Sequence, residues 1–250
     1  MRDTAVMLCG HGSRDSEGIA EFERAAHGLR LRLADYDVGT GYLEFGPPTI
    51  RDGLAALAGR GARRIYAVPA MLSAASHVKH DLPREIAGFA AARPGVEVRL
   101  ARELGIDGRL IAAAAERIAA AIADPGSGAA LVVVGHGSSD PAANANIREI
   151  AGLVGEAMGL GRDGAGLSGV AHPRVPATLR RLAGLGWRRI VVFPYFLFTG
   201  VLVKRIYAAT DAVAEEFPAI DFIKASYLGA HDLVLDTLAD RVGELHHPPS

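Results

Sequence analysis

The 250-residue sequence predicts an α/β fold made of two tandem copies of one domain. Each copy is expected to hold a mostly parallel four-stranded sheet with helices on both faces. Two observations predict this class: short apolar runs alternate with helical patterns, and the whole pattern occurs twice. A Pro-Gly-Ser-Gly stretch at 125–128 has the composition of a linker, so we expect domains at 1–124 and 129–245.

The internal repeat has an offset of 125 residues. The motif Gly-His-Gly-Ser at 10–13 returns at 135–138, and the segment 54–65 returns at 179–190 with its Leu, Ala, Gly, Arg and Ile positions in register. A period of this length is too long for a solenoid repeat, so it indicates two fused copies of one domain.

The elements of each copy follow from hydrophobic periodicity. In the first copy, apolar runs predict strands at 4–10, 37–44, 63–69 and 96–101. Helical patterns between and after them predict helices at 16–34, 48–59, 79–93 and 107–123. The second copy repeats the order, with strands expected near 130–135, 167–171, 188–194 and 220–226. Right-handed crossovers place the carboxyl ends of these strands at one edge of each sheet, where open α/β sheets bind ligands.

Composition limits the kind of ligand. The chain has 27 Lys and Arg against 28 Asp and Glu, which gives no broad basic field, so nucleic-acid binding driven by phosphate neutralisation is not expected. The single cysteine, Cys9, cannot form an internal disulfide or a thiolate zinc cluster. The apolar run that ends at Gly10 is too short for a signal peptide or a membrane span. We expect a cytoplasmic protein with a small-molecule ligand and no membrane partner.

Three chemically capable side chains follow the first three strands. His11 follows the first strand, Glu44 closes the second and His77 comes just after the third, at equal intervals of 33 residues. Two imidazoles and a carboxylate suit a divalent first-row metal ion with coordination positions left open, and they could equally act as a general base. Ser13 and Arg14, at the start of the next helix, could hold an anionic group.

These motifs resemble those of the class II sirohydrochlorin chelatases, in the long form with two tandem domains that serves cobalamin or sirohaem synthesis. The resemblance covers about residues 3–242 and rests on three segments: Gly10–Asp15, Leu43–Ile50 and Pro69–Pro83. It implies that His11, Glu44 and His77 bind the metal and assist its insertion. It also implies that the substrate, a macrocycle with eight carboxylates, lies in a cleft between the domains.

The resemblance suggests insertion of Co²⁺, with Fe²⁺ as second choice, into sirohydrochlorin. The sequence contains no G-x-x-x-x-G-K-[ST] motif, so no nucleotide is expected. A metal or tetrapyrrole carrier without turnover is an alternative, and a phosphoryl-transfer enzyme that uses His11 as nucleophile is another. A fused pair could act as a monomer or as a weak homo-oligomer.

The second copy departs from the pattern. The positions equivalent to the three candidates are His136, Gly169 and Leu202, so only one imidazole persists. We therefore expect the first copy to be catalytic. The apolar loop 195–202 would either cover a flat ring or pack between the domains. His136 would contribute a base or a carboxylate contact, or would be a remnant of an ancestral site, which is also the interpretation of His172.

Overall fold

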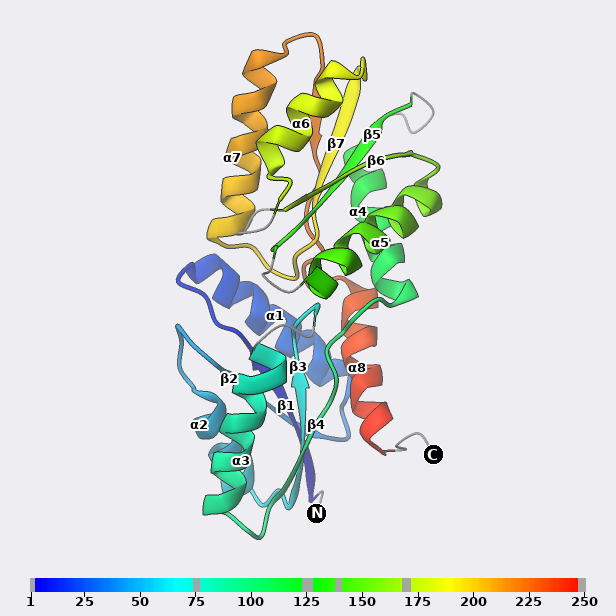
Figure 1. Ribbon diagram of the computed structural model, residues 1–250. Coiled ribbons are helices and arrows are strands. Elements are labelled where there is room, and N and C mark those ends of the chain that lie inside the picture. Colours follow the sequence, from blue (N-terminus) through cyan, green and yellow to red (C-terminus); the bar gives the residue numbers. More distant parts are fainter. Residues whose placement is uncertain (1–2, 74–76, 123–127, 138–140, 168–171, 247–250) are drawn as a thin grey trace. The chain divides into compact units, whose positions relative to one another are not determined.

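The computed structural model describes residues 3–73, 77–122, 128–137, 141–167 and 172–246, without the side chains of His77, Ala143 and 161–167. The chain forms two compact units, each with one parallel four-stranded sheet and helices packed on it (Figure 1). Unit 1 comprises residues 1–105 and 230–250, and unit 2 comprises 106–229. The predicted α/β class, with two copies of one architecture, is confirmed.

Unit 1 is built on a sheet with the strand order β2-β1-β3-β4, in which every pairing is parallel. Its elements in chain order are β1 (Thr4–Gly10), α1 (Ser16–Arg32), β2 (Asp37–Tyr42), α2 (Ile50–Gly59), β3 (Arg64–Pro69), the π-helix η1 (His77–Asp81), α3 (Leu82–Ala92), β4 (Glu97–Leu100) and, from the end of the chain, α8 (Asp232–His246). The central strand β1 is almost wholly buried, so the loop that follows its carboxyl end begins at a fixed point of the sheet.

Unit 2 has the equivalent strand order β6-β5-β7-β8, again parallel throughout. Its elements are α4 (Gly108–Ala121), β5 (Ala130–Gly135), α5 (Pro141–Met158), β6 (Gly161–Leu167), α6 (Val175–Gly184), β7 (Arg189–Pro194), α7 (Val201–Glu216) and β8 (Asp221–Lys224). The expected strand at 167–171 was placed too late, because β6 ends at Leu167 and 168–171 lie outside the described residues. Glycines at 161, 164 and 166 interrupt the apolar pattern of β6, which is tolerable in an edge strand that pairs only with β5.

Alternate residues of each central strand face opposite helix layers, as the period of a β-strand requires. In unit 1, Ala5, Met7 and Cys9 of β1 join one core with the apolar faces of α2 and α3. In unit 2, Val132 and Val134 of β5 take part in the equivalent core under α6 and α7. The helix α1 also contributes to the core of unit 1, since Phe22, Ala26 and Leu29 are buried.

The last helix of each repeat packs in the other unit. The helix α4 follows β4 of the first repeat, yet it packs on α5 and β7 of unit 2. The helix α8 follows β8 of the second repeat and packs on α1 and β3 of unit 1, where it appears in red beside the blue helix in Figure 1. The compact units therefore differ from the sequence halves 1–124 and 129–245 by the exchange of these two helices.

Two equivalent arginines hold the exchanged helices. Arg117 of α4 and Arg241 of α8 are 124 residues apart, as are Leu104 and Leu228. Arg241 is 1% exposed, and its guanidinium donates to the carbonyl oxygen of Leu104 at 2.7 Å. Arg117 donates to the carbonyl oxygen of Leu228 at 3.0 Å. Each arginine thus bonds the connection that belongs to the other repeat.

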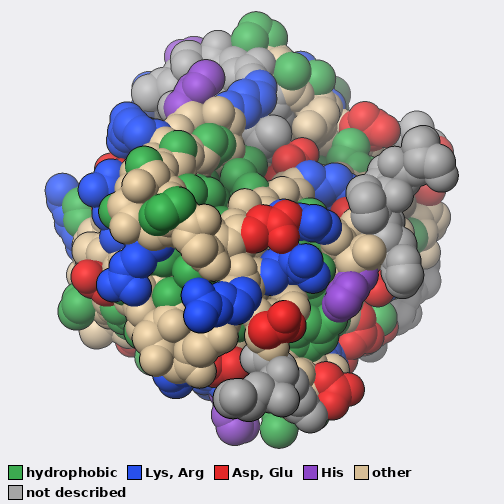
Figure 2. Space-filling view, turned by 90° about the horizontal axis from the view of Figure 1, so that it is seen from below, with side chains coloured by type: hydrophobic (Ala, Val, Ile, Leu, Met, Phe, Trp, Pro, Cys, Tyr) green, Lys and Arg blue, Asp and Glu red, His purple; other side chains and the backbone are tan. Residues whose placement is uncertain are grey.

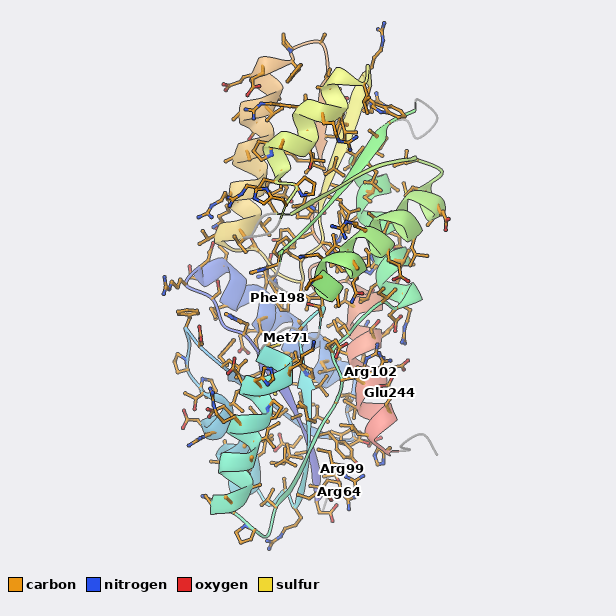
Figure 3. The ribbon with its side chains drawn as sticks, viewed as in Figure 1. Arg64, Met71, Arg99, Arg102, Phe198 and Glu244 are labelled. Atoms are coloured by element: carbon orange, nitrogen blue, oxygen red, sulfur yellow. The ribbon has the colours of Figure 1, made fainter. Side chains whose placement is uncertain are left out.

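The buried arginine is part of a larger polar cluster in unit 1. Arg241 also donates to Glu103 O at 3.2 Å and to the carboxylate of Glu244 at 2.8 Å. Arg102 donates to both oxygens of Glu244, at 3.0 and 2.8 Å, and Figure 3 shows the two side chains facing each other from α8 and the segment after β4. These bonds stabilise the ionised carboxylate of Glu244 and lower its pKa below the ordinary value. The hydrogen bond from Arg102 is the largest cause.

The amino-terminal end of the unit 1 sheet carries paired charges. Figure 2 shows basic and acidic side chains interspersed on the face seen from below. The ion pairs there include Arg60 with Asp37 at 2.6 Å and Arg64 with Glu97 at 2.8 Å. Exposed pairs of this kind contribute little to stability. Within the described parts of the chain, no helix is both long and apolar enough to cross a bilayer.

Candidate active site

The candidate site in unit 1 begins where β1 ends. Gly10 lies under α1, and a Cβ atom there would come within 2.8 Å of the ring of Phe22, so the last strand residue has to be small. His11 follows and is half-buried. Its Nδ1 lies 3.2 Å from the carbonyl oxygen of Gly12. A carbonyl oxygen only accepts hydrogen bonds, so in the neutral ring the proton sits on Nδ1 and the lone pair on Nε2, the arrangement that metal-binding histidines use.

The loop with His11 is joined directly to the loop with Glu44. The backbone N–H of Leu43 donates to Gly10 O and that of Glu44 donates to His11 O, both at 2.9 Å, so the pairing of β1 with β2 continues past the ends of the strands. Gly12 has a φ of +91°, and a Cβ atom on it would lie 1.7 Å from the carbonyl oxygen of Glu44. Glycine is therefore required at this position, and its absence of a side chain lets His11 and the exposed Glu44 share one edge of the sheet.

An aromatic residue without a predicted role completes this edge. Phe45 follows Glu44, has a φ of +54° and is 44% exposed. The guanidinium carbon of Arg14 lies 4.5 Å from the centre of its ring, and the ring of His11 lies 6.1 Å away, tilted by 34°. The signal in the sequence was an aromatic residue outside any apolar stripe, directly after a candidate ligand.

The start of α1 is occupied by the chain's own side chains. The hydroxyl oxygen of Ser13 accepts a hydrogen bond from Asp15 N at 3.0 Å. The carboxylate of Asp15 caps α1 by accepting from Glu17 N at 3.1 Å. A carboxylate at a helix N-terminus already takes the role that an anionic ligand would have there. Arg14, which is exposed, is the group in this segment that remains suited to an anion.

The third candidate, His77, begins the π-helix η1 in the connection after β3. The imidazole of His77 and residues 74–76 lie outside the described residues, so its distance to His11 and Glu44 is not part of the described geometry. The connection itself is anchored in unit 1: Ala70 N donates to Cys9 O at 2.9 Å, and Met71, labelled in Figure 3, accepts from Leu104 N at 3.0 Å. Single turns of π-helix are rare and occur often at functional sites.

Two further observations concern metal binding. Burial raises the pKa of the Cys9 thiol to about 12, so it stays protonated near neutral pH and is not suited as a metal ligand, although it lies two residues from His11. Among the side chains that the structure describes, no three His, Cys, Asp or Glu groups come together closely enough to hold a metal ion. The imidazole of His77 is not among the side chains that this statement covers.

A pocket of about 370 Å³ lies beside the Glu44 loop, in unit 1. It is lined by Tyr42, Leu43, Thr49, Ile50, Arg51 and Glu85. Its polar part is an ion pair between Arg51 of α2 and Glu85 of α3 at 2.8 Å. The helix α2 follows the Glu44 loop, and α3 follows η1, which begins at His77. This ion pair therefore joins the helices that come after Glu44 and His77.

The equivalent loop of unit 2 keeps the histidine and its local geometry. His136 follows β5, and its Nδ1 lies 2.9 Å from the carbonyl oxygen of Gly137. A Cβ atom on Gly135 would meet Ile147 of α5 at 2.6 Å, as one on Gly10 would meet Phe22. His136 is exposed, and its ring lies 6.4 Å from that of Phe196.

The other two equivalent positions of unit 2 carry no ligand. Gly169 lies outside the described residues, and Leu202 is in the first turn of α7. Phe196, in the loop after β7, packs against the core of unit 2. His172 is exposed and precedes a cis peptide bond to Pro173, at the position equivalent to the cis bond before Pro48.

The loop after β7 contains one unusual polar group. Tyr195 is 2% exposed, and its hydroxyl has no hydrogen-bond partner among the described residues. Burial raises the pKa of this phenol. Tyr195 and Leu197 are buried, whereas Phe198, labelled in Figure 3, is half-buried. At least the first part of the segment 195–202 is therefore packed inside the protein.

Comparison with known proteins gives matches over nearly the whole chain. The CbiX family profile matches residues 5–121 and 130–245, which are the two repeats. A sirohydrochlorin ferrochelatase of Priestia megaterium is 33% identical over 245 residues, covering 96% of this chain and 90% of the relative. A sirohydrochlorin cobaltochelatase of the same organism is 30% identical over 248 residues, covering 96% and 79%.

Solved structures agree with these matches. SirB from Bacillus subtilis with Fe³⁺ superimposes with a TM-score of 0.83 at 27% identity, over 96% of this chain and 94% of that chain. The sirohydrochlorin chelatase SirB from Bacillus subtilis subspecies spizizenii in complex with cobalt also gives a TM-score of 0.83 at 27% identity, over 98% and 96% of the two chains. The predicted architecture thus has experimental counterparts that span both repeats.

Proposed function

Because this chain belongs to the CbiX family, we propose that it is a sirohydrochlorin chelatase, which inserts a divalent metal ion into that tetrapyrrole. The observation that carries the proposal is the junction of the His11 and Glu44 loops at the carboxyl edge of the unit 1 sheet. The metal ion is a substrate here. Co²⁺ is our first choice and Fe²⁺ the second; relatives named for both reactions match this chain, at 30% and 33% identity.

Metal insertion needs protein ligands that bind the metal ion and then release it to the macrocycle. We assign this role to His11, Glu44 and His77. The contact of His11 Nδ1 with Gly12 O presents Nε2 as the metal-binding nitrogen. Three protein ligands leave coordination positions open, where pyrrole nitrogens can replace water.

Charge and proton balance follow from the chemistry of the ring. Each divalent ion that enters sirohydrochlorin displaces two N–H protons, so two protons leave for every turnover. The carboxylate of Glu44 and an imidazole that has released the metal are the candidate acceptors for these protons. No nucleotide is required in this scheme.

Binding of the macrocycle is assigned to cationic and polar groups near the same edge. Arg14 is suited to pair with a carboxylate of sirohydrochlorin in bidentate fashion. The hydroxyl of Ser13 can still donate, because its contact with Asp15 N uses only the oxygen as acceptor. His136 would add a contact to a carboxylate of the macrocycle, outside the three assigned metal ligands. We place the reaction in the cytoplasm, carried out by a monomer or a weak homo-oligomer.

The proposal is tested by mixing purified protein with sirohydrochlorin and Co²⁺ or Fe²⁺ and following the visible spectrum of the macrocycle. A chelatase present at one hundredth of the substrate concentration converts all of it at a rate proportional to enzyme. A carrier changes the spectrum only in proportion to its own amount, and that result would refute catalysis. A competition between the two metals identifies the preferred ion.

A further inference from the structure

Phe45 has a backbone conformation that folding alone does not explain. Phe45 is the one non-glycine residue with positive φ in the described part of the chain. A bulky side chain in this region of backbone space is a genuine outlier, and glycine would adopt it without steric cost. Such outliers concentrate at ligand sites, where the surrounding structure holds them in place.

The side chain of Phe45 is also poorly buried. The residue is 44% exposed, and the other large hydrophobic residues exposed to this degree or more in the described part of the chain are aliphatic: Leu31, Leu185 and Val201. The ring therefore gains little from removal of apolar surface from water. Backbone strain and exposure both disfavour phenylalanine at this position. We therefore attribute its presence to contact with a ligand and not to the stability of the fold.

The neighbours of the ring show what kind of ligand would supply that benefit. The guanidinium of Arg14 lies over one face of the ring, 4.5 Å from its centre, and the ring of His11 lies 6.1 Å away, so a ligand would stack on the other face. An exposed aromatic ring beside a guanidinium suits a flat, conjugated molecule that bears carboxylates: the ring offers a stacking surface and the arginine a charge partner. Phe45 directly follows the hydrogen bond from Glu44 N to His11 O that joins the two site loops.

We propose that Phe45 is a substrate-contacting residue that stacks on the macrocycle beside the metal site, with Arg14 taking one of its carboxylates. This inference rests on the proposed function, since it names a residue that recognises the same tetrapyrrole. It adds a specificity element, because a ring that stacks on Phe45 is placed next to His11 and Glu44. A smaller anionic ligand without a flat conjugated surface would gain nothing from Phe45.

The test is a Phe45→Gly variant, compared with Phe45→Tyr and with Leu185→Ala as a matched loss of an exposed apolar side chain in unit 2. Glycine accepts the positive φ, so Phe45→Gly should unfold at the same temperature as the parent or higher. Binding of sirohydrochlorin is measured by absorbance titration without metal, and turnover with Co²⁺ is measured in parallel. We expect Phe45→Gly to raise the Kd and KM for sirohydrochlorin about tenfold, with Phe45→Tyr and Leu185→Ala close to the parent.

The two readouts separate the inference from the proposed function. Weaker binding in Phe45→Gly together with a parent that binds but does not turn over would support the inference and refute the chelatase. A parent that binds no sirohydrochlorin would refute both. Unchanged binding in Phe45→Gly, or a lowered melting temperature with unchanged Kd, would overturn the inference alone and make the ring a structural element.

Discussion

The loops after β1 and β5 share their sequence and their local geometry but differ in what surrounds them. In both, a histidine donates from Nδ1 to the next carbonyl, and a glycine before it makes room for the following helix. Glu44 lies beside the loop after β1, whereas the sequence has Gly169 at the equivalent position of the other repeat. The glycines and backbone bonds thus maintain the fold, while the reactive side chains can be lost without altering it.

The largest effect expected from this comparison separates the two histidines. We predict that His11→Ala lowers kcat for metal insertion by about 10² to 10⁴, because it removes a ligand and a candidate proton acceptor. His136→Ala, the equivalent change in the second repeat, should lower kcat less than about threefold, since it leaves the three assigned ligands intact. Steady-state rates with Co²⁺ decide between these outcomes, and equal losses in both variants would show that the second repeat shares the chemistry.

The second prediction concerns the junction of the two loops. Gly12→Ala places a Cβ atom 1.7 Å from Glu44 O, so the loops must separate, and we expect a loss of about 3 kcal/mol in unfolding free energy with at least a tenfold fall in kcat/KM. Gly61→Ala is the matched control, because Gly61 also has positive φ, +104°, but no atom lies within 4 Å of its would-be Cβ. It should cost about 1 kcal/mol and leave activity unchanged. Equal behaviour of the two variants in denaturation and rate assays would mean that backbone strain, and not the close approach, is what matters.

The exchanged helices provide a comparison in stability. Arg241 is buried and donates to two carbonyl oxygens, whereas Arg117 is half-buried and donates to one. Arg241→Met leaves two carbonyl oxygens without their donor, so we predict a loss of about 3 kcal/mol, against about 1 kcal/mol for Arg117→Met, where one carbonyl oxygen loses its donor. Urea denaturation measures both losses. A larger loss for Arg117→Met would show that α4 depends on its arginine more than α8 does.

The smallest predicted effect is on pH dependence. The pKa of Glu244 is lowered in the folded state, chiefly by its hydrogen bond with Arg102, so its contribution to stability is full above the unfolded pKa of about 4.3 and is lost as pH falls through the depressed folded value. We expect the parent to lose more thermal stability between about pH 5 and pH 3 than Glu244→Gln does. An equal fall in melting temperature with pH in the parent and in Glu244→Gln would contradict this prediction.

The sequence predicted the elements because most of them are strongly patterned. The strands β1, β3, β5 and β7 are buried apolar runs, and their limits were predicted to within one residue. The edge strand β6 was misplaced because its glycines carry no periodic signal. The exchange of α4 and α8 was not predictable, because a repeat pattern shows which segments are alike and not which copy they pack against.

The candidate site was predicted in part. The parallel topology brings the loops of His11 and Glu44 together, as their positions after adjacent strands indicated. Phe45 was missed because its positive φ is imposed by tertiary contacts, and the sequence shows only an aromatic residue directly after a candidate ligand. The pairing of Ser13 with Asp15 N was missed for a similar reason, since a hydroxyl that bonds to its own backbone has the same sequence signal as one that awaits a ligand.

The central claim is that His11, Glu44 and His77 bind one metal ion in the first repeat and that the second repeat binds none. X-ray absorption spectroscopy of the protein loaded with Co²⁺, together with the stoichiometry of binding, tests it most directly. The account predicts one ion per chain with two imidazoles and a carboxylate in its shell, and one imidazole fewer in His77→Ala but not in His136→Ala. Two ions per chain, or a shell that is unchanged in His77→Ala, would contradict it.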